Sequence, residues 1–316
     1  MLQKEFALAD TTVFAPGSRF MDLPAPSVQD EAPGVCVLGI PFDCGTHPFR
    51  VGSRQGPDAI REQSRLLRPF DLFRRAGVEN PAQFLRAVDA GNVVCWPGDP
   101  ERSYPVIETA VDRILEAGAI PVTMGGDGAV TLPQLRAVGR RHPGLVVLHF
   151  DAHTDTYPVS GYNTASTFTR AAEETLLDVS ASFHVGTRGN SFMGGVVEYS
   201  REVGYTVIPF DDFDRDQVAM LDEIKRRVGD RPVYLCFDMD VFDPSCAPGV
   251  CTPEWGGLTA KEGLALLRRL SGLNFVAFDV NTVSPPQDVG GATAFLAATV
   301  MQEFLALAVA AIRRHA

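Results

Sequence analysis

Hydrophobic and polar positions alternate along most of the chain in a way that predicts buried strands separated by amphipathic helices. Short apolar runs, such as "VCVLG" at 35–39 and "LVVLHF" at 145–150, are typical of strands buried on both faces of a sheet. Between such runs, segments like "AKEGLALLRRL" at 260–270 place apolar residues at helical spacing. The pattern therefore predicts a three-layer α/β/α fold with a central, mainly parallel sheet.

The remaining elements follow the same alternation. We expect further strands at 120–126, 182–188, 206–211, 233–240 and 275–281. We expect further helices at 57–67, 106–119, 131–142 and 218–228, and a long C-terminal helix from about Ala292.

The first 34 residues differ from the rest because they are rich in Pro, Ala and Asp and show no sustained period. They predict an extended N-terminal arm at 1–34, followed by a single α/β domain at 35–316. With 316 residues, of which 45% are hydrophobic and 21% charged, the chain is long enough to bury one large core.

Composition narrows the possible partners and compartments. The formal net charge of -11, without a basic patch, argues against nucleic acid as a partner. We expect no membrane span, because no apolar run reaches about eighteen residues, and the N-terminus lacks the regions of a signal peptide. A cytoplasmic protein is the expectation. The six cysteines show no CxxC spacing and are predicted to be reduced thiols.

Acidic residues gather where two of the predicted strands end. Asp151, His153 and Asp155 follow one strand, and Asp238 and Asp240 end another. Ligands of such sheets bind beyond the carboxyl ends of the strands, and residues two apart in an extended segment point to the same face. Carboxylates packed together repel one another unless they bind protons, water or a cation. The cluster therefore predicts a site for Mn, Mg, Fe, Ni or Zn.

Other residues near these strand ends have simpler interpretations. Asp127 and Asp279 each follow an apolar run, and a single aspartate in that place is usually a turn or cap residue, which is the interpretation we favour. His149 is offset from Asp151 by an even step, so it can face the site. A buried core histidine remains the interpretation we favour for it.

Several motifs together resemble those of the ureohydrolase superfamily of arginases, agmatinases and guanidino-acid hydrolases, with the agmatinase branch most similar. The resemblance implies an arginase-like α/β fold with a binuclear manganese or nickel site, at which water attacks a guanidinium carbon and urea or a similar product is released. The motifs are "GIPFDCGTHPFRVGSRQGPDAIRE" at 39–62, "GGDGAVT" at 125–131, "HFDAHTDTY" at 149–157, "VGTRG" at 185–189, "FDMDVFDPSCAPGVCTPEWGGLT" at 237–259 and "FDVNTVSPPQD" at 278–288.

The resemblance also implies a role for each acidic residue of the cluster. Asp151 and Asp238 would bridge two metal ions, His153 and Asp240 would complete one site, and Asp155 would belong to the other. The second site of the family normally includes the histidine that closes the motif G-G-D-H, and this sequence has Gly128 there. We therefore expect one or two ions, with a weakened second site.

Two further departures fall on positions that handle the substrate in the family. Thr164 occupies the place of a histidine that moves protons or holds substrate, and Thr282 occupies the place of a glutamate that pairs with guanidinium. Threonine cannot form a bidentate ion pair with guanidinium. Substrate identity is expected to depend on the loops at 46–50 and 190–195.

These departures leave two main hypotheses. The first, which the sequence favours, is a low-activity or non-catalytic subunit that pairs with an active paralogue in a trimer or hexamer, as in two-subunit members such as metformin hydrolase. The alternative is an active agmatinase-like hydrolase with a single-metal or altered site, acting on a non-standard guanidino, biguanide or amide substrate. A third, a binding protein that uses the crevice as a sensor, is favoured by no feature of the sequence.

Overall fold

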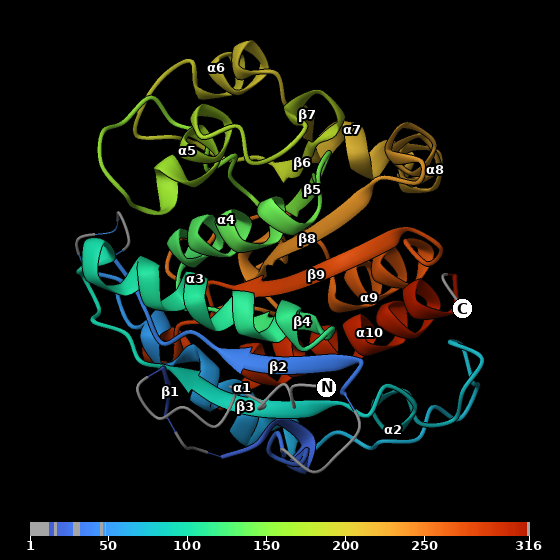
Figure 1. The fold of residues 1–316 in the computed structure, drawn as a ribbon. Coiled ribbons are helices and arrows are strands. Elements are labelled where there is room, and N and C mark those ends of the chain that lie inside the picture. Colours follow the sequence, from blue (N-terminus) through green and yellow to red (C-terminus); the bar gives the residue numbers. More distant parts are fainter. Residues whose placement is uncertain (1–12, 16–17, 28–31, 45–46, 48, 315–316) are drawn as a thin grey trace.

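The computed structural model describes residues 13–15, 18–27, 32–44, 47 and 49–314. Within these residues, a nine-stranded sheet runs through the molecule in the order β1-β3-β2-β4-β9-β8-β5-β6-β7 (Figure 1). The strands are β1 (Phe14–Ala15), β2 (Val35–Gly39), β3 (Val88–Val93), β4 (Ile120–Met124), β5 (Val146–Phe150), β6 (Phe183–Thr187), β7 (Thr206–Pro209), β8 (Pro232–Asp238) and β9 (Asn274–Asn281). Strand β1 is antiparallel to β3, and every other pairing is parallel, which confirms the predicted sheet.

Helices cover both faces of this sheet (Figure 1). They are α1 (Gly56–Ser64), α2 (Pro81–Phe84), α3 (Pro100–Glu116), α4 (Thr131–Arg141), α5 (Thr167–Glu173), α6 (Val196–Val203), α7 (Phe210–Arg215), α8 (Gln217–Val228), α9 (Ala260–Arg269) and α10 (Ala292–Arg314). Helices α3 and α4 pack together on one face, whereas α10 packs against α1, α9 and β9 on the other. The three-layer α/β/α prediction is therefore confirmed.

Polar residues at the helix ends explain where several helices begin. Helix α3 begins at Pro100, because the Asp99 side chain accepts a hydrogen bond from the Arg102 N–H and proline suits the first helical position. We predicted a later start, near Val106, since Pro105 interrupts the apolar spacing. Helix α9 begins with a capping box, in which the side chains of Thr259 and Glu262 each accept a hydrogen bond from the other residue's backbone N–H.

Strand β3 was missed because its sequence, "VDAGNV", is not an apolar run. Its Asp89 is fully buried and pairs with the equally buried Arg61, whose Nε lies 2.9 Å from Asp89 Oδ2. The same oxygen accepts a hydrogen bond of 2.7 Å from the Phe20 N–H, so part of the N-terminal segment is tied to this strand. The division between an arm and a domain at residue 34 stays a prediction, and residues 1–12 lie outside the described part of the chain.

Helix α10 is long and apolar enough to cross a membrane by length and composition, with a mean hydropathy of 1.9. We had expected no such segment. However, 61% of its most apolar window is buried against the rest of the protein, and the helix packs on β9. These contacts are those of a core helix in an α/β fold, since a helix that is apolar on most sides is buried.

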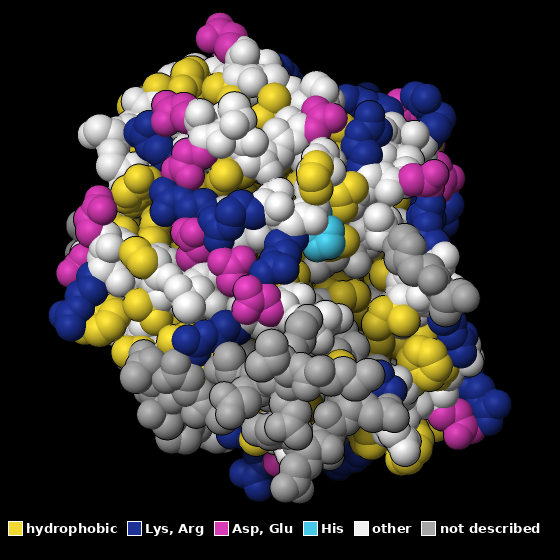
Figure 2. All heavy atoms as spheres, viewed as in Figure 1, with side chains coloured by type: hydrophobic (Ala, Val, Ile, Leu, Met, Phe, Trp, Pro, Cys, Tyr) yellow, Lys and Arg dark blue, Asp and Glu magenta, His cyan; other side chains and the backbone are white. Residues whose placement is uncertain are grey.

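Charged side chains of both signs are interspersed over α3 and α4 on the face shown in Figure 2. Arg140 of α4, for example, pairs with Glu108 and Asp112 of α3. Such mixed, exposed pairs are typical of a solvated helix face. All six cysteines are free thiols, as predicted.

Candidate metal centre

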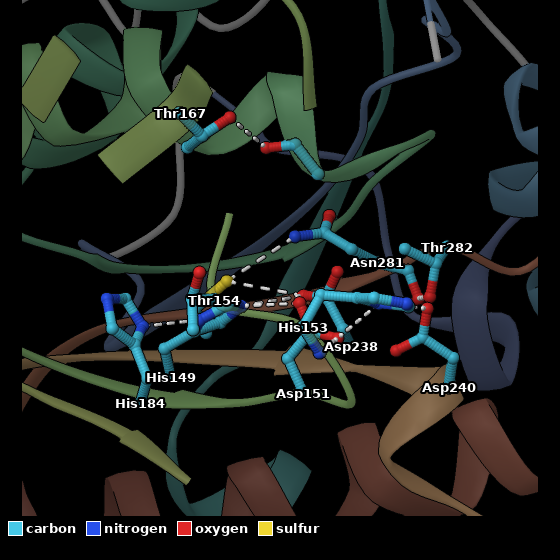
Figure 3. Close-up of polar contacts among 12 residues, drawn as sticks. His149, Asp151, His153, Thr154, Thr167, His184, Asp238, Asp240, Asn281 and Thr282 are labelled. Atoms are coloured by element: carbon cyan, nitrogen blue, oxygen red, sulfur yellow. Dashed lines mark hydrogen bonds and ion pairs between the residues drawn. The ribbon is translucent and has the colours of Figure 1, made fainter. Parts of the chain in front are cut away.

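Four neighbouring strands, β4, β9, β8 and β5, end at one edge of the sheet and bring the predicted site residues together. Asp151 directly follows β5, Asp238 is the last residue of β8, and Asp240 lies in the short 3₁₀ helix η7 (Met239–Val241). With His153 and Asp155 they form one cluster, and all but the partly buried His153 are buried. Figure 3 shows Asp151, His153, Asp238 and Asp240 of this cluster.

The side chains converge for a different reason from the one we predicted. An extended segment was expected to put Asp151, His153 and Asp155 on one face. Instead the chain turns there: the His153 N–H donates a hydrogen bond of 2.8 Å to Asp151 Oδ1, and Asp155 adopts a φ of 46°. Aspartate tolerates that left-handed conformation better than most residues.

Besides a group of His149, Cys236 and Asp238, the described residues form two overlapping groups, and within each group the ligand atoms all lie within 4.8 Å of one another. One group contains Asp151, His153 and Asp240, and the other contains His149, Asp151, Asp155 and Asp238. Asp151 belongs to both groups, so two ions bound there would share it. The bridging role expected for Asp238 stays a prediction.

The donor set fits a divalent cation. Within the described structure, Asp240 Oδ1 is buried and has no hydrogen-bond partner. Burial and the charge of Asp151 raise the pKa of Asp240 to about 7, and burial with the charges of Asp151 and Asp238 raises the pKa of Asp155 well above its usual range. An orphaned oxygen among crowded carboxylates is what a cation satisfies, and carboxylates with imidazole suit manganese and similar metals.

The two imidazoles beside these carboxylates respond in the opposite direction. Although burial lowers it, the nearby Asp151 and Asp238 raise the pKa of His149 to about 10. In the same way, and against the effect of burial, Asp151 and Asp240 hold the pKa of His153 well above its usual range. The protonated imidazoles therefore supply positive charge to the cluster, which is what a bound metal ion supplies when it displaces those protons.

A cavity of about 490 Å³ opens onto the cluster. Both loops that we expected to determine the substrate contribute to its wall, through His47 and Arg50 in one and through Asn190, Ser191 and Phe192 in the other. Thr164, Thr282 and Glu254 also line it. The carboxylate cluster is therefore accessible to a small molecule.

Comparison with known proteins gives this arrangement a family. Residues 33–307, most of the chain, match the sequence profile of the arginase family. The chain belongs to the arginase family. It is 40% identical over 313 residues to guanidinopropionase from Pseudomonas aeruginosa, which covers 98% of this chain and 96% of that protein. It is 35% identical over 284 residues to the mitochondrial agmatinase of Gallus gallus, covering 88% and 82% of the two chains.

A solved structure agrees with the family's fold. Proclavaminate amidino hydrolase from Streptomyces clavuligerus superposes with a TM-score of 0.87 at 36% sequence identity, over 94% of this chain and 99% of that one. The predicted arginase-like fold is thereby confirmed.

In this arginase-family chain, position 128 faces the second group of carboxylates. A Cβ atom added to Gly128 would lie 2.7 Å from Asp155 Oδ2 and 3.5 Å from Asp238 Oδ2. The turn itself is held by Asp127, whose carboxylate accepts hydrogen bonds from the Ala129 and Cys44 N–H groups. The cap interpretation of Asp127 is confirmed. A side chain at position 128 would lie beside the carboxylates, and the Asp155 side chain would have to shift to make room for it.

Thr282 lines the cavity in a strained conformation. Its φ of 71° is rare for a β-branched residue. Its hydroxyl accepts a hydrogen bond of 3.0 Å from the Met239 N–H and donates one of 2.7 Å to the Asn281 carbonyl. The side chain is therefore occupied in holding the backbone and presents no charge to a ligand.

Asp279 is not a turn or cap residue, so that interpretation was wrong. It lies inside β9, is fully buried, and its two oxygens are within hydrogen-bonding distance of hydroxyl and amide groups of five residues, which are Thr123, Thr131, Gln134, Tyr234 and Asn281. Burial raises the pKa of Asp279 to about 6 although hydroxyls of this network lower it.

His149 lies closer to the site than we predicted from the sequence. It is buried in the core, as we favoured, but its Nε2 also lies 3.0 Å from Asp151 Oδ2 (Figure 3). The even step from His149 in β5 to Asp151, which directly follows the strand, was the signal for this placement. His184, which carries no spacing signal, contacts the other ring nitrogen of His149.

Proposed function

We propose that this chain hydrolyses a guanidine- or amidine-type carbon–nitrogen bond of a small molecule with the help of divalent cations. The observation that carries the proposal is that the cavity reaches the acidic cluster, because a purely structural ion needs no such access. The names of the relatives, guanidinopropionase and agmatinase, support the substrate class.

Manganese is the cation that we propose, with nickel as the alternative. Asp151, His153 and Asp240 would hold one ion, and Asp155 and Asp238 would contribute to a second. A divalent cation supplies Lewis acidity and makes a water molecule more acidic at neutral pH. The surrounding carboxylates fix its place, and the cavity wall orients the substrate.

Recognition of the substrate must differ from that of a ureohydrolase with an acidic residue at position 282. The hydroxyl of Thr282 is already engaged with the backbone. Outside the cluster, Glu254 is the carboxylate among the described residues that line the cavity. We propose that Glu254 holds a cationic group of the substrate, so Glu254→Gln should raise KM about tenfold and change kcat less.

The second candidate function is a subunit of low activity that pairs with an active paralogue, as in metformin hydrolase. Gly128, Thr164 and Thr282 support it, because each replaces a chemically active residue expected from the resemblance. Under either candidate we propose a trimer or hexamer in the cytoplasm, and under this one a hetero-oligomer. The open cavity and the position of His149 beside the cluster lead us to rank it second.

The test is urea release by the purified chain loaded with Mn²⁺ or Ni²⁺. Guanidinopropionate, guanidinobutyrate, agmatine and a biguanide are the substrates, and Asp240→Asn is the matched control. Turnover by the lone chain that Asp240→Asn abolishes supports the first candidate. Turnover that requires co-expression with a paralogue containing G-G-D-H supports the second. No release under either condition contradicts both.

A further inference from the structure

His149 and Gly128 face the same carboxylates from two different elements. His149 Nε2 lies 3.0 Å from Asp151 Oδ2 and 3.7 Å from Asp238 Oδ1. A side chain at position 128 would start 2.7 Å from Asp155 Oδ2 and 3.5 Å from Asp238 Oδ2. Position 128 and the imidazole nitrogen of His149, which comes from strand β5, therefore both lie beside Asp238.

The hydrogen bonds behind His149 fix which nitrogen faces the cluster. Its Nδ1 lies 2.8 Å from His184 Nδ1, and His184 Nε2 lies 3.0 Å from the Thr156 hydroxyl (Figure 3 shows the two imidazoles). When the Thr156 hydroxyl donates to the Thr154 carbonyl, at 2.9 Å, it accepts from His184 Nε2–H. His184 Nδ1 then accepts from His149 Nδ1–H, and this leaves His149 Nε2 facing the carboxylates, where it can bind a cation in place of a proton.

This arrangement is the one in which histidines bind metals. A metal-ligating imidazole usually donates its second N–H to a fixed partner, which sets the tautomer and the ring orientation. Adjacent ligands of an ion with bonds of about 2.1 Å are separated by about 3 Å, so the observed separation of 3.0 Å suits two ligands of one cation. It also suits an N–H···O hydrogen bond in which His149 only positions Asp151, and experiment separates the two.

We propose that His149 Nε2 is a ligand of the second cation, together with Asp151, Asp155 and Asp238, in place of a side chain at position 128. The inference rests on the proposed function only in requiring that the chain binds divalent cations. It predicts two ions per chain despite Gly128, with the nitrogen ligand of each ion supplied by the segment that includes β5 and the turn after it.

The test measures bound metal and not turnover. Chains loaded with Mn²⁺ and desalted are analysed by mass spectrometry for ions per chain, and Co²⁺-loaded chains are compared by visible absorption. We expect two ions in the parent, one in His149→Ala and one in His153→Ala, with different cobalt spectra in the two variants because each loses a different ion. Circular dichroism in chelator confirms that the variants fold.

Two further variants separate a ligand from a positioning residue. His184→Gln, which disturbs only the partner of His149, should weaken the second ion by about 10–100-fold, whereas His149→Ala should weaken it by more than about 100-fold. Adding Gly128→His to His149→Ala should restore two ions. The inference is overturned if His149→Ala retains two ions, or if the parent binds one ion and Gly128→His alone raises the count to two. Two ions in a chain without turnover would uphold it while contradicting the proposed activity.

Discussion

Two sets of buried carboxylates on adjacent strands have different partners. In β9, Asp279 is surrounded by hydroxyl and amide groups, including those of Thr131 and Tyr234. At the ends of β8 and β5, the carboxylates contact one another and two imidazoles, and Asp240 Oδ1 has no hydrogen-bond partner within the described structure. The partners of a carboxylate therefore tell more about its role than its burial does.

The comparison also shows that a raised pKa does not by itself separate the two sets. Burial raises the pKa of Asp279 to about 6, and burial with the charge of Asp151 raises the pKa of Asp240 to about 7. The carboxylate of Asp279 is nevertheless satisfied by donors, whereas that of Asp240 is crowded by another acid. We infer that the first stabilises the fold and the second is kept for a cation.

The largest effect on stability is expected from removing the carboxylate of Asp279, which accepts hydrogen bonds from its buried neighbours. Asp279→Ala leaves the buried donors of Thr131, Gln134 and Tyr234 without their acceptor, so we expect the free energy of unfolding to fall by about 3–5 kcal/mol. Urea unfolding should give the same loss with and without chelator. Asp279→Asn, which keeps one acceptor oxygen, serves as the control and should lose less. A loss that depends on metal would contradict the distinction between the two sets.

Replacing Asp240 of the acidic cluster with alanine should affect stability differently. In chelator, Asp240→Ala should remain within about 1 kcal/mol of the parent, because it removes a crowded, partly unsatisfied carboxylate. With Mn²⁺ at about 100 times its dissociation constant, the parent should gain about 2.7 kcal/mol and the variant much less. Thermal unfolding with and without Mn²⁺ measures both values. Equal gains in the two proteins would show that Asp240 holds no ion.

The dependence of stability on pH should reverse when metal is added. In the folded chain Asp127 and Asp240 have pKa values of about 7, above the usual value of about 4, so each costs stability above pH 7 and the cost is relieved as pH falls. His149, with a pKa of about 10, acts in the same direction, since its stabilisation is lost as pH rises from about 6.5.

In chelator we therefore expect the free energy of unfolding to rise by about 2–3 kcal/mol between pH 8 and pH 6.5. With saturating Mn²⁺ it should fall, because protons compete with the cation for the same ligands. Urea unfolding at each pH provides the measurement. If the free energy of unfolding changes with pH in the same direction in chelator and with Mn²⁺, the cluster binds no metal.

The smallest effect on stability is expected at Thr282, which follows β9 and bonds the N–H of Met239, the residue after Asp238. Thr282→Ser keeps the hydroxyl bonds to the Met239 N–H and the Asn281 carbonyl and removes the β-branch from a residue with a φ of 71°. We expect a gain of about 0.5–1 kcal/mol in the free energy of unfolding, with unchanged metal content. Thr282→Val, which keeps the branch and loses the hydroxyl, should be less stable than the parent. Stabilisation by Thr282→Val would show that the hydroxyl bonds contribute nothing.

Most of the fold could be predicted because its strands are short apolar runs separated by helices with regular spacing. Strand β3 could not, since it contains Asp89, whose buried carboxylate pairs with Arg61 of α1 and accepts hydrogen bonds from the Phe20 and Gly91 N–H groups. The early start of α3 was hidden by Pro105. In each case a contact or a cap compensates locally for an unfavourable sequence.

The acidic cluster was predicted from strand ends, but the local reason was different. Asp155 reaches the cluster through a left-handed turn, and Asp240 through a 3₁₀ helix, and neither follows from a period of two. Asp279 and His149 were misjudged because their roles depend on partners from other strands and helices, which spacing within one strand does not reveal. Whether the cluster residues bind metal stays a prediction.

The turn after β4 keeps its shape through Asp127, which bonds the Ala129 and Cys44 N–H groups, and the side chain at position 128 takes no part in this. A mutation at position 128 can therefore add a donor atom without breaking the hydrogen bonds of the turn, although the Asp155 side chain would have to shift. Related sequences that lack an imidazole at this position should be screened for bound metal before they are classified as inactive.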